Sequence, residues 1–99
     1  MIVYVAGRIS GVSDYKTKFE IAAMKLRDSG YTVLNPAVLP SDLTWEQAMP
    51  ICMEMLKVAD AIYLQKGWQQ SKGAMMEYEY AKEHGKIIQY EEVPDAVND

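Results

Sequence analysis

A short segment near the C-terminus, "QQSKGAMMEYEYAKEHG" (69–85), combines residue types that can do chemistry. Small and polar residues, Ser71 and Gly73, precede a helical pattern that ends at Gly85, and Glu77 follows one turn into that pattern. The Ser71 hydroxyl suits a helix N-cap, which is the commoner explanation for such a residue. The free N–H groups of a helix N-terminus also bind phosphate or carboxylate. The segment therefore predicts a helix over 71–84 that carries a carboxylate below a candidate anion site.

Helix geometry separates Glu77 from Glu79, because residues two positions apart lie on roughly opposite faces. Glu77 shares its face with small residues that let a helix lie close to a sheet, namely Gly73, Ala74 and Ala81. Glu79 shares its face with the charged Lys72, Lys82 and Glu83. An inward carboxylate costs free energy unless it is hydrogen-bonded or used. We therefore predict that Glu77 is functional and that Glu79 faces solvent.

The second candidate loop is "GRISG", residues 7–11, which follows the first apolar run. It has neither the dinucleotide fingerprint nor the phosphate-loop pattern of ATPases. Its two glycines still allow the backbone to fold close to an anion, with Arg8 and Ser10 as the polar side chains. A tight turn between a strand and a helix, with a solvated Arg8, explains the loop equally well.

Alternating strand and helix patterns place these loops. Apolar β-branched or aromatic runs predict strands at 2–7, 31–34, 60–64 and 86–90, and periodic apolar positions predict helices at 15–29, 45–58 and 71–84. Thr44 and Gln47 have capping-box spacing, whereas Pro50 predicts a kink or a break into two helices. The pattern indicates a single doubly wound, Rossmann- or flavodoxin-like α/β domain over 1–92. Its sheet is mostly parallel with four to five strands, and an acidic tail follows at 93–99.

In such sheets ligands bind at the carboxyl ends of the strands. The loops after the first three predicted strands, which contain Gly7, Asn35 and Ser71 respectively, should therefore converge at one end of the domain. Asp60 stands at the start of the third strand, where an Asp often ends a helix or binds a loop backbone.

Composition limits the partners. The 99 residues carry a formal charge of −4, which argues against a nucleic-acid polymer but allows one small anionic ligand. The one cysteine, Cys52, lies in an apolar helical stretch and reads as a buried, inert thiol of a reducing compartment. No signal peptide, membrane span, cofactor motif or metal-ligand spacing is present, so we predict a cytoplasmic protein without metal or cofactor.

Three stretches taken together resemble the nucleoside 2-deoxyribosyltransferase superfamily: "YVAGRISG", "ADAIYL", and the register of Ser71, Gly73, Glu77, Ala81, Gly85 and Lys86. More narrowly, the chain is similar to the branch that hydrolyses 2′-deoxynucleoside 5′-monophosphates and to small phage-borne relatives of the superfamily. The resemblance runs along nearly the whole chain and implies the same α/β fold.

The resemblance also implies an activity: cleavage, or transfer, at the N-glycosidic bond of a 2′-deoxynucleotide. It makes Glu77 the nucleophile that forms a covalent glycosyl-enzyme. Asp60 would protonate or orient the departing base, and Tyr4 matches a pocket tyrosine. The remaining matches are to two phosphate-contacting loops, the first with Gly7, Ser10 and Gly11 and the second with Ser71 and Gly73.

Two departures from the family pattern affect the substrate. The nucleotide-hydrolysing branch has G-S-x-R-G in its first loop, whereas this chain has Gly7-Arg8-Ile9-Ser10-Gly11, with hydroxyl and guanidinium exchanged. The nucleoside-acting transferases carry Asp at the position of Ser71, and because an Asp would repel phosphate, Ser71 favours a phosphorylated substrate. Ribosylated dinucleotides are a further substrate class that nothing in the chain selects.

Two alternatives remain open from the sequence. The swapped loop and the short C-terminus also suit a non-catalytic nucleotide-binding module of the same fold. The apolar stripe of Trp45, Met49, Met53 and Leu56 predicts a homodimer contact, although such stripes more often belong to the core.

Overall fold

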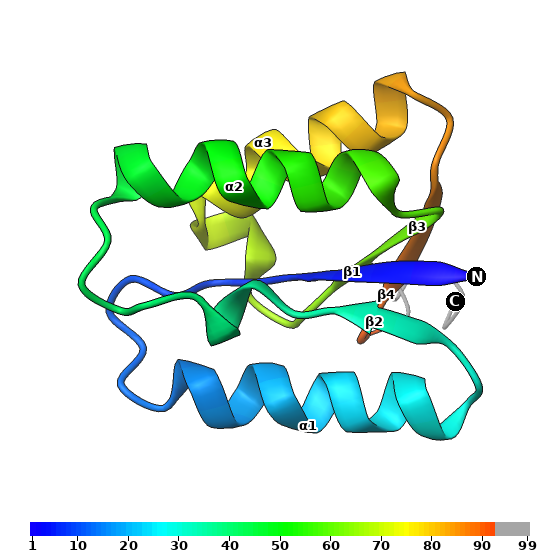
Figure 1. The fold of residues 1–99 in the computed structure, drawn as a ribbon, viewed down its shortest axis with the longest axis horizontal. Coiled ribbons are helices and arrows are strands. Elements are labelled where there is room, and N and C mark those ends of the chain that lie inside the picture. The colour runs from blue at the N-terminus through cyan, green and yellow to red at the C-terminus, as the bar shows by residue number, and fades with distance from the viewer. Residues whose placement is uncertain (93–99) are drawn as a thin grey trace, which may run out of the picture.

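The computed structural model describes residues 1–92, so the predicted acidic tail at 93–99 lies outside the described residues. Strands and helices alternate along the chain (Figure 1). The strands are β1 (Ile2–Ala6), β2 (Thr32–Leu34), β3 (Ala61–Leu64) and β4 (Ile87–Tyr90). The helices are α1 (Tyr15–Asp28), α2 (Trp45–Val58) and α3 (Lys72–Glu83), with short 3-10 turns η1 (Pro36–Val38) and η2 (Trp68–Gln70).

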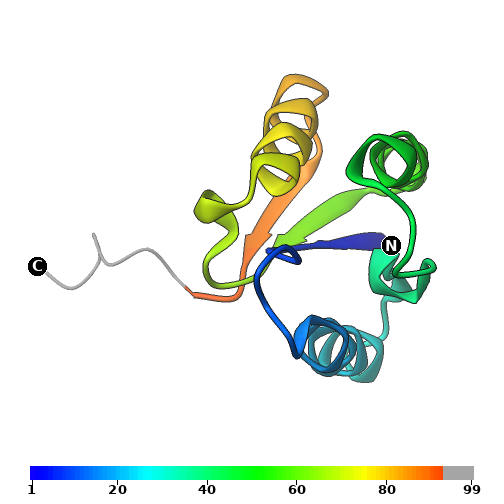
Figure 2. The ribbon, with the colours of Figure 1, turned by 90° about the vertical axis from the view of Figure 1, so that its left-hand side faces the viewer.

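Within these residues the strands form one four-stranded sheet in the order β2-β1-β3-β4, with every neighbouring pair parallel. The predicted doubly wound α/β fold is therefore confirmed. The chain steps from β1 to β2 in one direction and then crosses to β3 on the other side of β1. Because parallel crossovers are right-handed, α1 covers one face of the sheet while α2 and α3 cover the other (Figure 2).

Each face of the sheet has its own core, and the alternation of side chains along β1 feeds both. Val3 and Val5 point to the face under α1, where they pack with Phe19, Ala22 and Leu26. Tyr4 and Ala6 point to the opposite face, where they pack with Leu56 and Ala74 among others. The two central strands are thus buried on both faces, as their continuous apolar runs predict.

Helix α2 begins at the predicted capping box. The Gln47 backbone N–H donates to the Thr44 hydroxyl at 3.2 Å, and the Thr44 backbone N–H donates to the Gln47 side chain at 2.9 Å. Of the two outcomes predicted for Pro50, a kink or a break, the break is wrong, because α2 runs as one helix from Trp45 to Val58 (Figure 1). Pro50 is exposed, so the Glu46 carbonyl that loses its intrahelical donor can bond to water instead.

No helix among residues 1–92 combines the length and the apolar character that crossing a bilayer requires.

Candidate active site

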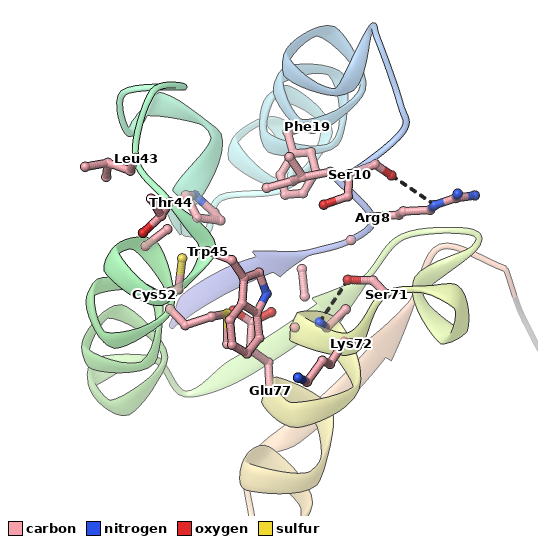
Figure 3. A pocket seen from close by; sticks show the side chains of 18 of the residues that line it. Arg8, Ser10, Phe19, Leu43, Thr44, Trp45, Cys52, Ser71, Lys72 and Glu77 are labelled. Carbon is pink, nitrogen blue, oxygen red and sulfur yellow. Dashed lines mark hydrogen bonds between the residues drawn. The ribbon is translucent and has the colours of Figure 1, made fainter.

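A cavity of about 720 Å³ opens at the carboxyl end of β1, on the face that carries α2 and α3 (Figure 3). Its wall comes from the loop after β1, the segment that leads into α2, and the first turns of α2 and α3. This is the switch point of strand order, where α/β sheets bind their ligands. The predicted site residues that line it are Tyr4, Gly7, Arg8, Ser10, Ser71, Gly73 and Glu77.

Glu77 lies at the inner end of this cavity. Its side chain projects from α3 toward the sheet, and the residue is only 5% exposed. The Tyr4 hydroxyl, which projects from β1, donates a hydrogen bond of 2.5 Å to Glu77 Oε2. Glu79 is exposed and lies 3.7 Å from the Lys82 ammonium. The predicted division of the two glutamates, one inward and one solvated, is confirmed.

Burial changes the acidity of this carboxyl. It raises the pKa of Glu77 from its usual 4.5 to about 7, while the hydrogen bond from Tyr4 opposes the shift because it stabilises the ionised form. At neutral pH the group therefore exists in both protonation states. A poorly hydrated carboxylate in a cavity is suited to act as a nucleophile or a general base, and strongly shifted carboxyls gather at functional sites.

Cys52 is a third titratable group in this cavity, and the sequence did not indicate its place there. It projects from α2 beside Tyr4 and is 7% exposed. Burial raises the pKa of the thiol, which disfavours the reactive thiolate. The predicted burial of Cys52 is confirmed. Burial, Glu77 and Cys52 together raise the pKa of Tyr4, so its hydroxyl remains a hydrogen-bond donor.

The first turn of α3 borders the cavity above Glu77. The Ala74 N–H donates to the Ser71 hydroxyl at 3.1 Å, so Ser71 is the N-cap of the helix. Its hydroxyl hydrogen remains free to donate to a ligand. The N–H groups of Lys72 and Gly73 precede the first intrahelical bonds and have no acceptor within the helix, and both residues line the cavity.

Gly73 allows α3 to approach α2 closely. A Cβ at this position would lie 3.1 Å from Met49 Sδ and 3.4 Å from Trp45 Nε1.

Trp45 and Met49 line the cavity, and Leu56 is fully buried in the core. The predicted subunit stripe is thus cavity wall at one end and core at the other. The sequence pattern did not reveal this because it cannot show which neighbour covers a helix face.

Arg8 lies on the rim of the cavity but does not reach into it. Its Nε donates to the Ser10 carbonyl at 3.2 Å, and the side chain is exposed. In Figure 3 it extends away from Trp45 and Glu77. The loop after β1 therefore adopts the alternative that the sequence left open, a tight turn with a solvated Arg8.

Three predicted site residues are not brought to the cavity. Asp60 lies at the amino end of the sheet, where its Oδ2 accepts a 2.7 Å hydrogen bond from the Ile2 N–H, so the backbone contact is the interpretation the structure supports. Asn35 caps η1 by accepting from the Ala37 N–H at 2.9 Å. Gly11 forms a turn with φ of +78° and is absent from the cavity wall.

Comparisons with known proteins agree with a domain that spans the described fold. Residues 1–90 match a family described as a domain of unknown function, DUF4406. Neither the curated proteins nor the solved structures contained a match. The family match covers every strand and helix, including the residues that build the cavity. The chain therefore belongs to the DUF4406 family.

Proposed function

We propose that this protein cleaves, or transfers at, the N-glycosidic bond of a 2′-deoxynucleoside 5′-monophosphate, with Glu77 as the nucleophile. One observation carries the proposal: a buried carboxyl, hydrogen-bonded to Tyr4, stands at the inner end of a cavity that has free backbone N–H groups at its mouth. Pockets of 300–1,000 Å³ bind small organic ligands, so about 720 Å³ accommodates a nucleotide. The sequence resemblance supports the same chemistry.

The proposed reaction has two steps. Ionised Glu77 attacks C1′ of the sugar, the C1′–N bond breaks, and the base leaves with the bonding electrons and takes a proton from solvent. Water then attacks C1′, loses its proton and frees the Glu77 carboxylate, which releases 2-deoxyribose 5-phosphate. A second base in place of water gives transfer. The Glu77 carboxylate stabilises the positive charge that develops on the sugar before the covalent bond forms.

Tyr4 has a defined part in this scheme. Its hydroxyl holds one oxygen of Glu77, which fixes the carboxyl in the cavity and leaves the other oxygen for C1′. The same hydrogen bond lowers the pKa of Glu77 and so increases the ionised fraction at neutral pH. Tyr4 is therefore a positioning residue. Asp60 takes no part in the proposal, because it lies at the other end of the sheet.

The 5′-phosphate is proposed to bind at the first turn of α3. The Ser71 hydroxyl and the N–H groups of Lys72 and Gly73 provide donors about one turn from Glu77. That separation suits a nucleotide whose phosphate and C1′ lie at opposite sides of one sugar ring.

A product assay tests the proposal. The protein is incubated with each of the four common 2′-deoxynucleoside 5′-monophosphates, and free base and 2-deoxyribose 5-phosphate are separated by chromatography. Glu77→Gln should reduce release by several orders of magnitude, because the nucleophile and its charge are lost together. Glu79→Gln is the matched control on the solvated face of the same helix and should retain normal turnover. Equal turnover in Glu77→Gln would exclude this nucleophile.

A non-catalytic nucleotide-binding module is the second candidate, and two observations favour it. The Arg8 side chain points away from the cavity. Asp60, which the resemblance implies would protonate or orient the departing base, lies at the other end of the sheet. Nucleotide binding by calorimetry without release of any base would support the module over the enzyme.

A further inference from the structure

We propose that Lys72, and not Arg8, is the cation with which the cavity recognises the anionic group of its ligand, and that the Trp45 ring is where Lys72 rests when no ligand is bound. The inference rests on the proposed function for the nature of the ligand, a sugar phosphate. It concerns a different property of the site, namely which side chain carries the positive charge.

Two cationic side chains border the cavity, and the structure distinguishes them. Arg8 has its Nε bonded to the Ser10 carbonyl and extends away from the cavity. Lys72 is the first residue of α3, beside the Ser71 hydroxyl and the free N–H groups of the first turn. A phosphate held by those donors would therefore lie next to Lys72, whereas Arg8 would have to release its hydrogen bond to the Ser10 carbonyl and swing back toward the cavity to reach it.

Within residues 1–92, Lys72 also forms no ion pair with a carboxylate. Ion pairs among residues 1–92 use other cations, namely Lys18, Arg27, Lys57, Lys66 and Lys82. Lys86 donates to the Lys57 and Ala59 carbonyls at the end of α2. The Lys72 ammonium instead lies 4.7 Å from the centroid of the Trp45 ring.

The contact between Lys72 and Trp45 is weak enough to exchange. A cation over an exposed indole is held less strongly than the same cation in a charge-assisted hydrogen bond to a phosphate oxygen. Trp45 is 39% exposed, so water already screens the pair. The four-carbon stem of Lys72 lets the ammonium leave the ring and turn toward the phosphate while the helix stays in place.

Calorimetric titration with 2-deoxyribose 5-phosphate and with uncharged 2-deoxyribose tests which cation binds. Lys72→Met, which keeps an unbranched side chain one atom shorter and removes the charge, should weaken binding of the sugar phosphate about 10- to 100-fold and leave binding of the sugar unchanged. Lys16→Met removes an equal charge from an exposed position of α1, away from the cavity. It should change the affinity for the sugar phosphate and the affinity for the sugar by no more than about twofold.

Arg8→Met is the deciding variant. It should weaken binding of 2-deoxyribose 5-phosphate much less than Lys72→Met does. The reverse order, with binding lost in Arg8→Met and retained in Lys72→Met, would overturn the inference, as would failure of the unaltered protein to bind 2-deoxyribose 5-phosphate.

Indole fluorescence tests the resting place. The chain has two tryptophans, and Trp68 packs against Tyr78 outside the cavity wall, so Trp68→Phe makes Trp45 the sole reporter. The sugar phosphate should change the emission of Trp45 in this background and should have no such effect once Lys72→Met is added. Binding without any change in Trp45 emission would overturn the proposed exchange.

Enzyme assays separate this inference from the proposed function. Nucleotide cleavage with an unchanged KM in Lys72→Met would overturn the inference and leave the N-glycosidase proposal in place. Sugar-phosphate binding that depends on Lys72, without cleavage of any nucleotide, would support the inference and count against catalysis.

Discussion

At the scale of single residues, the Glu77 carboxyl makes stability depend on pH. Its pKa is about 7 in the folded protein and near 4.5 when exposed, so the folded state binds more protons between these values. This extra proton binding stabilises the folded state by about 3 kcal/mol below about pH 4.5. The contribution is lost as the pH rises through 7, where Glu77 ionises in the folded protein. Glu77→Gln lacks this loss, because a neutral amide cannot ionise.

Urea denaturation at pH 5 and pH 8 measures the effect. Between pH 5 and pH 8, the free energy of unfolding of the unaltered protein should fall by about 2–3 kcal/mol more than that of Glu77→Gln, since the two proteins share all other titrating groups. Glu79→Gln should show no such difference from the unaltered protein, because Glu79 is solvated in both states. Parallel pH profiles for the unaltered protein and Glu77→Gln would contradict the raised pKa.

Tyr4 tunes the same group in the opposite direction. Its hydrogen bond lowers the pKa of Glu77, so Tyr4→Phe should raise that pKa further. The ascending limb of the pH profile for kcat/KM should therefore move to higher pH, with a larger loss of activity at pH 6 than at pH 8. An unchanged limb with uniformly lower activity would indicate that Tyr4 acts only by packing.

At the scale of elements, the ends of β1 and β3 meet so closely that a side chain at Gly7 would clash with Gln65. The Gln65 N–H donates to the Ala6 carbonyl, and the Gln65 side chain lies over Gly7, where an added Cβ would stand 2.6 Å from Nε2. Gln65 is buried and cannot easily move aside. Gly7 is thus explained by strand packing, with no ligand needed.

Gly7→Ala should lower the free energy of unfolding by about 1–3 kcal/mol, measured by urea denaturation, because the buried amide must shift. Adding Gln65→Ala should restore part of that loss, since it removes the 2.6 Å contact with Nε2 and leaves only the 3.2 Å contact with Cβ of residue 65. Gly73→Ala is a milder comparison, because its Cβ would press on the flexible end of Met49. No rescue in the double variant would contradict this explanation of Gly7.

At the scale of the whole molecule, the predicted homodimer is still a prediction, but the surface available for it has changed. In the segment 45–56, Trp45 and Met49 line the cavity, with Trp45 still 39% exposed, and Leu56 is in the core. Ile51 is 40% exposed and is not part of the cavity wall. Val58, seven positions further along α2, is also exposed. These two residues lie near one side of the helix, and they are the exposed large apolar residues of α2 that lie outside the cavity wall. We expect them to contact a second copy.

Light scattering at tens of micromolar should give twice the 11.2 kDa mass of one chain. Ile51→Lys should shift the mass toward that of a monomer, because it places a charge in the proposed contact. Ile21→Lys, at an exposed apolar position of α1 on the opposite face of the sheet, is the control and should leave the mass unchanged. A monomer mass for the unaltered protein would contradict the prediction.

Local patterns in the sequence were sufficient for the elements and for Glu77. Strand runs, capping residues and helical periodicity depend on neighbours within a few positions, so the α/β order, the Thr44 capping box and the inward direction of Glu77 follow from the chain itself. Pro50 is the exception, because packing against the sheet stabilises α2 beyond its local propensity.

Only the tertiary structure decided which residues share the cavity. Tyr4, Cys52 and Glu77 come from β1, α2 and α3, and their meeting depends on how two helices lie across one sheet. The same holds for Arg8, whose side chain is held by the carbonyl of Ser10 in its own turn. Asp60 differs, because its predicted place at the start of the third strand already puts it at the amino end of the sheet, away from the carboxyl ends that bind ligands. Spacing along a chain reports the face of an element, whereas contacts between elements depend on packing angles that spacing does not encode.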